Sequence, residues 1–229
     1  MFKKFIFNVT PKTKPRIVII GDSHVNIYSE CVDLITEFNI TRVIHTDSED
    51  VNRNGRFIPY LMNTIGDRGH LLLQHHIDKY KDNTDYMMFV FGEPDVRIHF
   101  NKQINELGRD ENEVVYNVAS KYVAKLRQIV PSHIKIIVRY LLPQRQHSMF
   151  GDWVPRGSLQ ERVRYTQKMN IALQQICYQM RVLFLTNSEF ANLTTVEGEL
   201  KDEYCDGLTH YNSASVKYII NELSQIVNA

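Results

Sequence analysis

The sequence has few cysteines, no long apolar run and no excess of charge of either sign. The three cysteines are odd in number, far apart and without CxxC spacing: Cys31, Cys177 and Cys205. This pattern argues against a disulfide framework or a zinc site and favours a reducing compartment. The 27 basic and 26 acidic side chains nearly cancel, so charge gives no reason to expect a nucleic-acid partner or an anionic membrane surface.

The apolar segments are also too short for a membrane helix or an export signal. No stretch approaches the roughly 18 apolar residues that a membrane helix needs. The apolar run near the start ends at Asn8, which is too short for the core of a signal peptide. We therefore expect a cytoplasmic protein that makes no membrane contact. The scattered histidines lack ligand spacing with acidic side chains, so we expect neither a metal site nor any other cofactor.

Two alternating apolar patterns predict the fold class. Short β-branched runs predict five buried strands: Arg16–Ile20, Arg42–Thr46, Tyr86–Gly92, Lys135–Tyr140 and Val182–Thr186. Helical spacing of apolar residues lies between and after them: Val25–Phe38, Glu113–Val130, Leu159–Met180 and Ser213–Val227. Strands that alternate with helices form parallel sheets covered on both faces. The sequence thus predicts one α/β domain over residues 1–229, a three-layer sandwich with an N-terminal extension at residues 1–14.

Three stretches have no regular pattern, and each follows one of the middle strands. They are Asp47–Gly69, Glu93–Asn112 and Leu141–Ser158. In open parallel sheets the ligand lies at the carboxyl ends of the strands, where such loops build the binding cleft. The alternative is that a given loop is surface elaboration without function.

The first motif with chemical content ends the first predicted strand. It reads Ile19-Ile20-Gly21-Asp22-Ser23-His24, and it places Ser23 at a helix N-terminus, where N–H groups favour negative charge. That position suits a nucleophilic serine and the oxyanion it creates. The simpler alternative is that Asp22 or Ser23 only caps the helix.

The second motif lies between the fifth predicted strand and the last predicted helix. It reads Cys205-Asp206-Gly207-Leu208-Thr209-His210-Tyr211-Asn212. This location brings His210 to the same sheet edge as Ser23. A serine needs a base, and the base needs a carboxylate that fixes its tautomer; Asp206 is the candidate. His99 and His24 are the next candidate bases, and a loop histidine beside a capping aspartate is the alternative without chemistry.

The two motifs together resemble the SGNH (GDSL-like) hydrolases. That family has four sequence blocks on a flavodoxin-like three-layer fold with a five-stranded parallel sheet. They are a Gly-Asp-Ser block near the N-terminus, a Gly-containing block after the second strand, a Gly-x-Asn-Asp block after the third strand and an Asp-x-x-His block near the C-terminus. The resemblance spans essentially the whole chain. It implies that Ser23 is the nucleophile, His210 the base and Asp206 its orienting partner, although the spacing from Asp206 to His210 is one residue longer than in the family.

The third block departs from the family pattern. It reads Phe91-Gly92-Glu93-Pro94-Asp95-Val96-Arg97-Ile98-His99, and Pro94 stands where the family has an asparagine that helps to bind the oxyanion. Proline has neither that amide nor an N–H. The block resembles a Gly-Glu-x-Asp-x-Arg-x-His variant of SGNH-like proteins encoded near glycan-assembly genes. In that variant Arg97 is the natural replacement donor and Glu93 holds it.

The roles of several residues in this region have two possible interpretations. The segment from Glu93 through Asp95 to Arg97 is either part of the site or a structural ion-pair cluster. His99 follows Arg97 by two residues and is a further candidate site residue. For the second family block, Gly66 is the candidate backbone donor, and Asn54-Gly55 is a rival that fits an ordinary turn.

These observations predict a serine ester hydrolase or acyltransferase that acts on an O-acylated, carbohydrate-type small molecule or glycan without a cofactor. The first alternative is a catalytically weak SGNH-fold module that only binds glycan, because Pro94 removes a donor. A nucleotide-binding domain is disfavoured, since no Gly-x-Gly-x-x-Gly or phosphate-loop motif follows the first strand.

Overall fold

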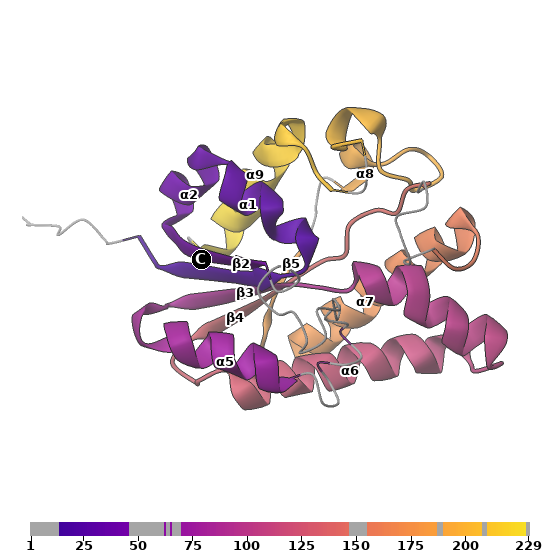
Figure 1. Cartoon of the computed structure of the whole chain (residues 1–229), viewed down its shortest axis with the longest axis horizontal. Coiled ribbons are helices and arrows are strands. Elements are labelled where there is room, and N and C mark those ends of the chain that lie inside the picture. Colours follow the sequence, from indigo (N-terminus) through magenta and orange to yellow (C-terminus); the bar gives the residue numbers. More distant parts are fainter. Residues whose placement is uncertain are drawn as a thin grey trace, which may run out of the picture.

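The computed structural model describes residues 14–45, 62, 65, 70–146, 155–186, 190–207 and 210–227. These residues form a five-stranded parallel sheet in the order β2-β1-β3-β4-β5 (Figure 1). The strands are β1 Ile17–Gly21, β2 Ile40–His45, β3 Tyr86–Val90, β4 Lys135–Arg139 and β5 Leu183–Leu185. All five predicted strands are confirmed, with ends that differ from the prediction by two residues or fewer.

Helices cover both faces of the sheet, as the alternating pattern predicts. One face carries α1 Asn26–Glu30, α2 Val32–Phe38 and α9 Val216–Val227, and the other carries α5 His70–Tyr80, α6 Glu111–Ile129 and α7 Leu159–Gln179 (Figure 1). Alternate residues of β1 point to opposite faces, so Ile17 and Ile19 pack into one core while Val18 and Ile20 pack into the other. The three-layer α/β/α fold is therefore confirmed. None of the helices in these described ranges combines the length and hydrophobicity that a membrane crossing needs.

Short helices connect these elements. They are η1 Ser23–Val25, η2 Lys81–Asn83, α8 Phe190–Leu193, η5 Asp202–Tyr204 and η6 Ser213–Ser215. The prediction of one continuous helix over Val25–Phe38 is wrong. The helix is interrupted at Cys31, whose backbone is extended. On one continuous helix Tyr28 and Leu34 would point about 120° apart. The break allows both side chains to be fully buried.

The segment after β3 is also more regular than predicted. Instead of an irregular loop, it contains two π-helices, η3 Asp95–Phe100 and η4 Lys102–Glu106. Pro94 stands in the first turn of this helical segment, where a missing N–H does no harm, and the Val96 N–H bonds to the Gly92 carbonyl. π-helical turns occur frequently at functional sites. The predicted loop Leu141–Ser158 is irregular where it is described, and of Asp47–Gly69 only Met62 and Ile65 are described.

The strand order places a switch point between β1 and β3. The chain leaves β1 towards the α1 face and leaves β3 towards the α6 face, so the carboxyl ends of these two neighbouring strands diverge. Ligands of open α/β sheets bind at such a switch point. Ser23 follows β1 and Glu93 follows β3, so both lie at this edge of the sheet.

Candidate active site

Ser23 lies on a tight turn between β1 and η1. A Cβ at Gly21 would collide with the Val90 carbonyl oxygen, so only glycine permits the approach of β1 to β3 at this point. Asp22 is the N-cap of η1, and its Oδ1 accepts a hydrogen bond from the His24 N–H at 3.0 Å. Because Asp22 makes the cap, the Ser23 hydroxyl is left for another partner.

The partner of Ser23 is His210. Its Nε2 lies 2.9 Å from Ser23 Oγ, and its Nδ1 lies 2.8 Å from Asp206 Oδ2. The structure therefore brings together the predicted nucleophile, base and carboxylate. We call the hydrogen-bonded series Ser23, His210, Asp206 the relay. When His210 is neutral and carries its proton on Nδ1, Nε2 is free to accept the Ser23 proton.

The longer spacing from Asp206 to His210 forms a closed loop. The Asp206 N–H donates to the His210 carbonyl at 3.0 Å, and the His210 N–H donates to Asp206 Oδ1 at 3.2 Å. Gly207 inside the loop has φ +92°, a left-handed conformation that glycine adopts without strain. The extra residue is thus accommodated while the carboxylate still reaches the imidazole.

A buried arginine anchors the residue after His210. Arg139 at the end of β4 is 1% exposed, and its guanidinium lies over three tyrosine rings at 5.1–5.4 Å from their centroids. These rings belong to Tyr28, Tyr140 and Tyr211. The Tyr140 and Tyr211 hydroxyls also lie 3.1 Å apart. Cation–π contacts are strongest where water is excluded, so this cluster ties the His210 loop to the sheet.

A second acid–histidine pair lies beside the first. His24 Nδ1 is 2.9 Å from Asp22 Oδ1, and both side chains are at most 5% exposed. The His24 and His210 rings meet edge to face with centroids 4.9 Å apart. The sequence offers His24 only as an alternative base. Its position directly after Ser23 is the one sequence feature that indicates a place in the site.

The charges around the two histidines shift their pKa values in opposite directions. Burial lowers the pKa of His24, but Asp22 and Glu93 together outweigh it, and the net pKa lies above the ordinary histidine value. Burial and the neighbouring His24 lower the pKa of His210, although Asp206 partly opposes them. His210 is therefore biased towards the neutral form that accepts a proton.

In the third block, Glu93 and Arg97 form an ion pair. Their side chains lie 3.3 Å apart on the first turns after β3, at 8% and 17% exposure. Burial raises the pKa of Glu93, and Arg97 and then His24 oppose this rise. Glu93 thus interacts with Arg97 on one side and with the Asp22–His24 pair on the other.

Asp95 and His99, two further predicted site residues, have other contacts. Asp95 is fully buried, and its Oδ2 accepts the Met62 N–H at 2.7 Å, so it fixes the backbone at Met62. His99 lies half-buried on η3, with its ring near Phe100. Gly66 and the rival Asn54-Gly55 turn are outside the described residues. Within the described ranges, no group of three or more histidine, cysteine or acidic side chains is placed to hold a metal ion.

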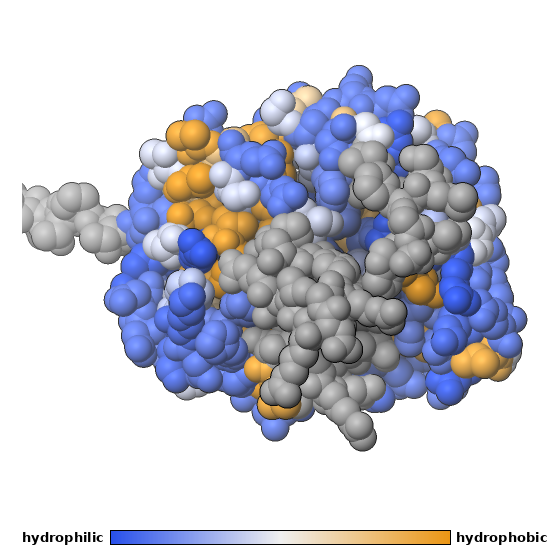
Figure 2. All heavy atoms as spheres, viewed as in Figure 1, coloured by the Kyte–Doolittle hydropathy of each residue, from blue (hydrophilic) through white to orange (hydrophobic). Residues whose placement is uncertain are grey.

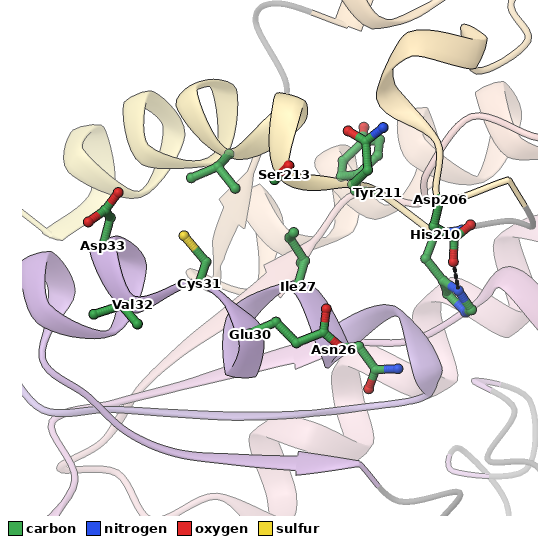
Figure 3. Close-up of a pocket in the computed structure, with 12 residues that line it drawn as sticks. Asn26, Ile27, Glu30, Cys31, Val32, Asp33, Asp206, His210, Tyr211 and Ser213 are labelled. Carbon is green, nitrogen blue, oxygen red and sulfur yellow. Dashed lines mark hydrogen bonds and ion pairs between the residues drawn. The ribbon is translucent and has the colours of Figure 1, made fainter.

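A groove of about 500 Å³ runs from the relay along α1 (Figure 3). His210 and Asp206 line one end and Asp33 lines the other, with Asn26 and Glu30 of α1 between them. Figure 2 shows apolar side chains gathered over α1 and α2 near this groove, where Val32 is 72% exposed. The groove therefore offers carboxylate and amide groups next to apolar surface.

Comparisons with known proteins bear on the fold. No protein-family model and no curated protein matches the chain significantly. Among solved structures, a GDSL-like lipase from Bacteroides thetaiotaomicron superposes with a TM-score of 0.60 at 11% identity, over 94% of this chain and 88% of that chain. A catalytic mutant of an acetylxylan esterase from Geobacillus stearothermophilus gives 0.54 at 10% identity, over 93% and 94%. The chain thus has the α/β fold of GDSL-like (SGNH) hydrolase structures.

Proposed function

We propose that the protein is a serine ester hydrolase of the SGNH type that acts on an O-acylated carbohydrate, with acyl transfer to a sugar hydroxyl as a variant of the same reaction. The observation that carries this proposal is the relay from Ser23 Oγ through His210 to Asp206, with gaps of 2.9 and 2.8 Å. Both solved structures named above are described as lipase or esterase, which supports the same reaction class.

The geometry gives each residue a step. Ser23 Oγ attacks the ester carbonyl while its proton passes to His210 Nε2, and Asp206 stabilises the imidazolium. The tetrahedral intermediate collapses when His210 returns this proton to the leaving alcohol oxygen, and the acyl group stays on Ser23. A water molecule, or a sugar hydroxyl in the transfer variant, then attacks the acyl-enzyme while His210 takes its proton. The bond between the acyl carbon and Ser23 Oγ breaks, His210 returns the proton to Ser23 Oγ, and the carboxylic acid or the new ester leaves.

The oxyanion requires donors, and Pro94 supplies none. The Ser23 N–H is one candidate donor and Gly66 remains a proposed second. We assign the third to Arg97, because Glu93 holds it on the segment that also faces Asp22 and His24. A guanidinium stays charged at all relevant pH values and offers five N–H groups.

The groove along α1 favours a hydroxylated substrate. The groove begins at His210, which protonates the leaving alcohol in the proposed reaction. We therefore expect the groove to bind the alcohol part of the ester. Its lining includes Asn26, Glu30 and Asp33, whose amide and carboxylate groups form hydrogen bonds with sugar hydroxyls. Val32, which is exposed, supplies apolar surface beside them.

A fluorophosphonate probe tests the proposed reaction class. We expect rapid labelling of the wild-type protein at Ser23, identified by peptide mass spectrometry, because only an activated serine reacts quickly. The same preparation should release acetate from a panel of acetylated sugars, and added unacetylated sugar reveals any transfer product. A protein that neither reacts with the probe nor cleaves any ester would instead be a glycan-binding module, the function that Pro94 favours.

Substitution of Arg97 tests the oxyanion assignment. We expect Arg97→Met to lower kcat by about 10²–10³ with little change in KM, because the contact forms mainly in the transition state. The rate should be expressed per folded active site, since Glu93 loses its ion-pair partner. Arg164→Met removes a comparable ion pair with Glu111 on the α6–α7 surface and should leave kcat unchanged. A loss of stability with intact kcat would assign Arg97 a structural role only.

A further inference from the structure

The Asp22–His24 pair has no step in the reaction described above, yet it is built into the site. Both side chains are buried at the turn that carries Ser23. The His24 ring packs against the ring of His210 at 4.9 Å with an interplanar angle of 63°. Among the described residues, His24 Nε2 has no hydrogen-bond partner. Asp22 has two contacts at this turn: its Oδ1 caps η1 and also lies 2.9 Å from His24 Nδ1.

We propose that His24, held in its charged form by Asp22, is a positioning residue for His210: it fixes the His210 ring towards Ser23 and keeps that ring neutral at mildly acidic pH. This inference rests on the proposed function, because His24 acts only through His210. His24 does not touch the reacting atoms in this role.

The charged groups around His24 favour its protonation. Asp22 faces it from its own turn, Glu93 faces it from the end of β3, and Arg139 opposes them from the end of β4. Around His210, the nearby charged groups are Asp206, Asp22 and His24 itself. Asp22 and Glu93 together outweigh burial and Arg139 and stabilise the His24 cation, and this cation disfavours a second positive charge on His210.

The arrangement changes what His210 does in each half of the reaction. A neighbouring cation makes His210 a weaker base, but it keeps the fraction of neutral His210 high when the pH falls. It also makes the His210 imidazolium a stronger acid, which speeds proton donation to the leaving alcohol. As the pH falls, activity is lost when His210 becomes protonated. We expect this loss, the acid limb of the pH profile, to occur at a lower pH than it would for a histidine without a neighbouring cation.

Two substitutions at His24 separate charge from packing. His24→Phe keeps the ring contact and His24→Gln keeps polarity, and both remove the charge. We expect each to move the acid limb of kcat/KM upward by about one pH unit. His76→Phe is the matched control, a buried histidine on α5 that should leave the limb in place. An unmoved limb in both His24 variants would overturn the inference.

A measurement on the Ser23→Ala protein covers the case in which the His24 variants do not fold. Histidine ring signals in nuclear magnetic resonance should show His24 titrating above the ordinary value of about 6.5 and His210 below it. The reverse order would contradict the inference. Failure of the proposed function is distinct: the wild-type protein would then show no esterase activity and no fluorophosphonate labelling, whatever the order of the two titrations.

Discussion

Ser23→Ala should lower kcat for ester cleavage by about 10⁵-fold or more, because the nucleophile and its base act as one unit. The free energy of unfolding should change by only about 1 kcal/mol, the net value of the hydrogen bond between Ser23 and His210. Helix capping does not depend on Ser23, since Asp22 makes the cap. Release of p-nitrophenol from p-nitrophenyl acetate and a urea unfolding curve measure the two effects.

Ser29→Ala is the matched control for this substitution. The Ser29 hydroxyl lies on the exposed side of α1 and donates to the Asn26 carbonyl at 2.8 Å. Its loss should leave kcat unchanged. If Ser23→Ala retained the wild-type rate at equal purity, the nucleophile would have to be another residue, and the proposed mechanism would fail with it.

His210→Gln should lower kcat by about 10⁴-fold, because the serine proton then has no acceptor. In the wild-type protein, activity should fall as the pH drops through the pKa of His210, since a protonated ring accepts no proton. This pKa lies below the ordinary histidine value because of burial and the charge of His24. The acid limb should therefore lie below about pH 6.5, and the residual rate of His210→Gln should lack it.

The pH profile of kcat/KM measures this limb. His133→Gln is the control, because His133 is exposed and its ring contacts the Lys81 carbonyl, away from Ser23 and His210 in the sequence; its profile should match that of the wild-type protein. A His210→Gln protein that keeps an unchanged acid limb would show that a different group accepts the proton.

The sequence predicts the strands and the location of the relay because both depend on local patterns. Buried β-branched runs identify strands by composition, and Ser23 and His210 each follow a predicted strand at its carboxyl end. Parallel strands bring such ends to one edge, so their proximity follows from topology. The contact between Asp206 and His210 was harder to foresee, because it depends on the closed loop that Gly207 permits.

Other features depend on contacts between distant segments and leave no local signal. The tyrosine rings around Arg139 come from α1, the end of β4 and the His210 loop, and nothing near Arg139 in sequence indicates its burial. The break at Cys31 involves neither proline nor glycine, so helical periodicity continues through it. The π-helices after β3 carry no distinctive composition, and Pro94 in their first turn suggests a loop instead.

The separation of the relay along the chain has a consequence during synthesis. Ser23 and His210 are 187 positions apart, and a ribosome that adds 5–20 residues per second needs roughly 10 to 40 s to travel between them. Throughout that interval the nascent chain contains Ser23 but not His210, so Ser23 lacks the base that the proposed mechanism assigns to it. In the proposed mechanism, reactivity towards esters therefore begins only once the segment with His210 has emerged and docked.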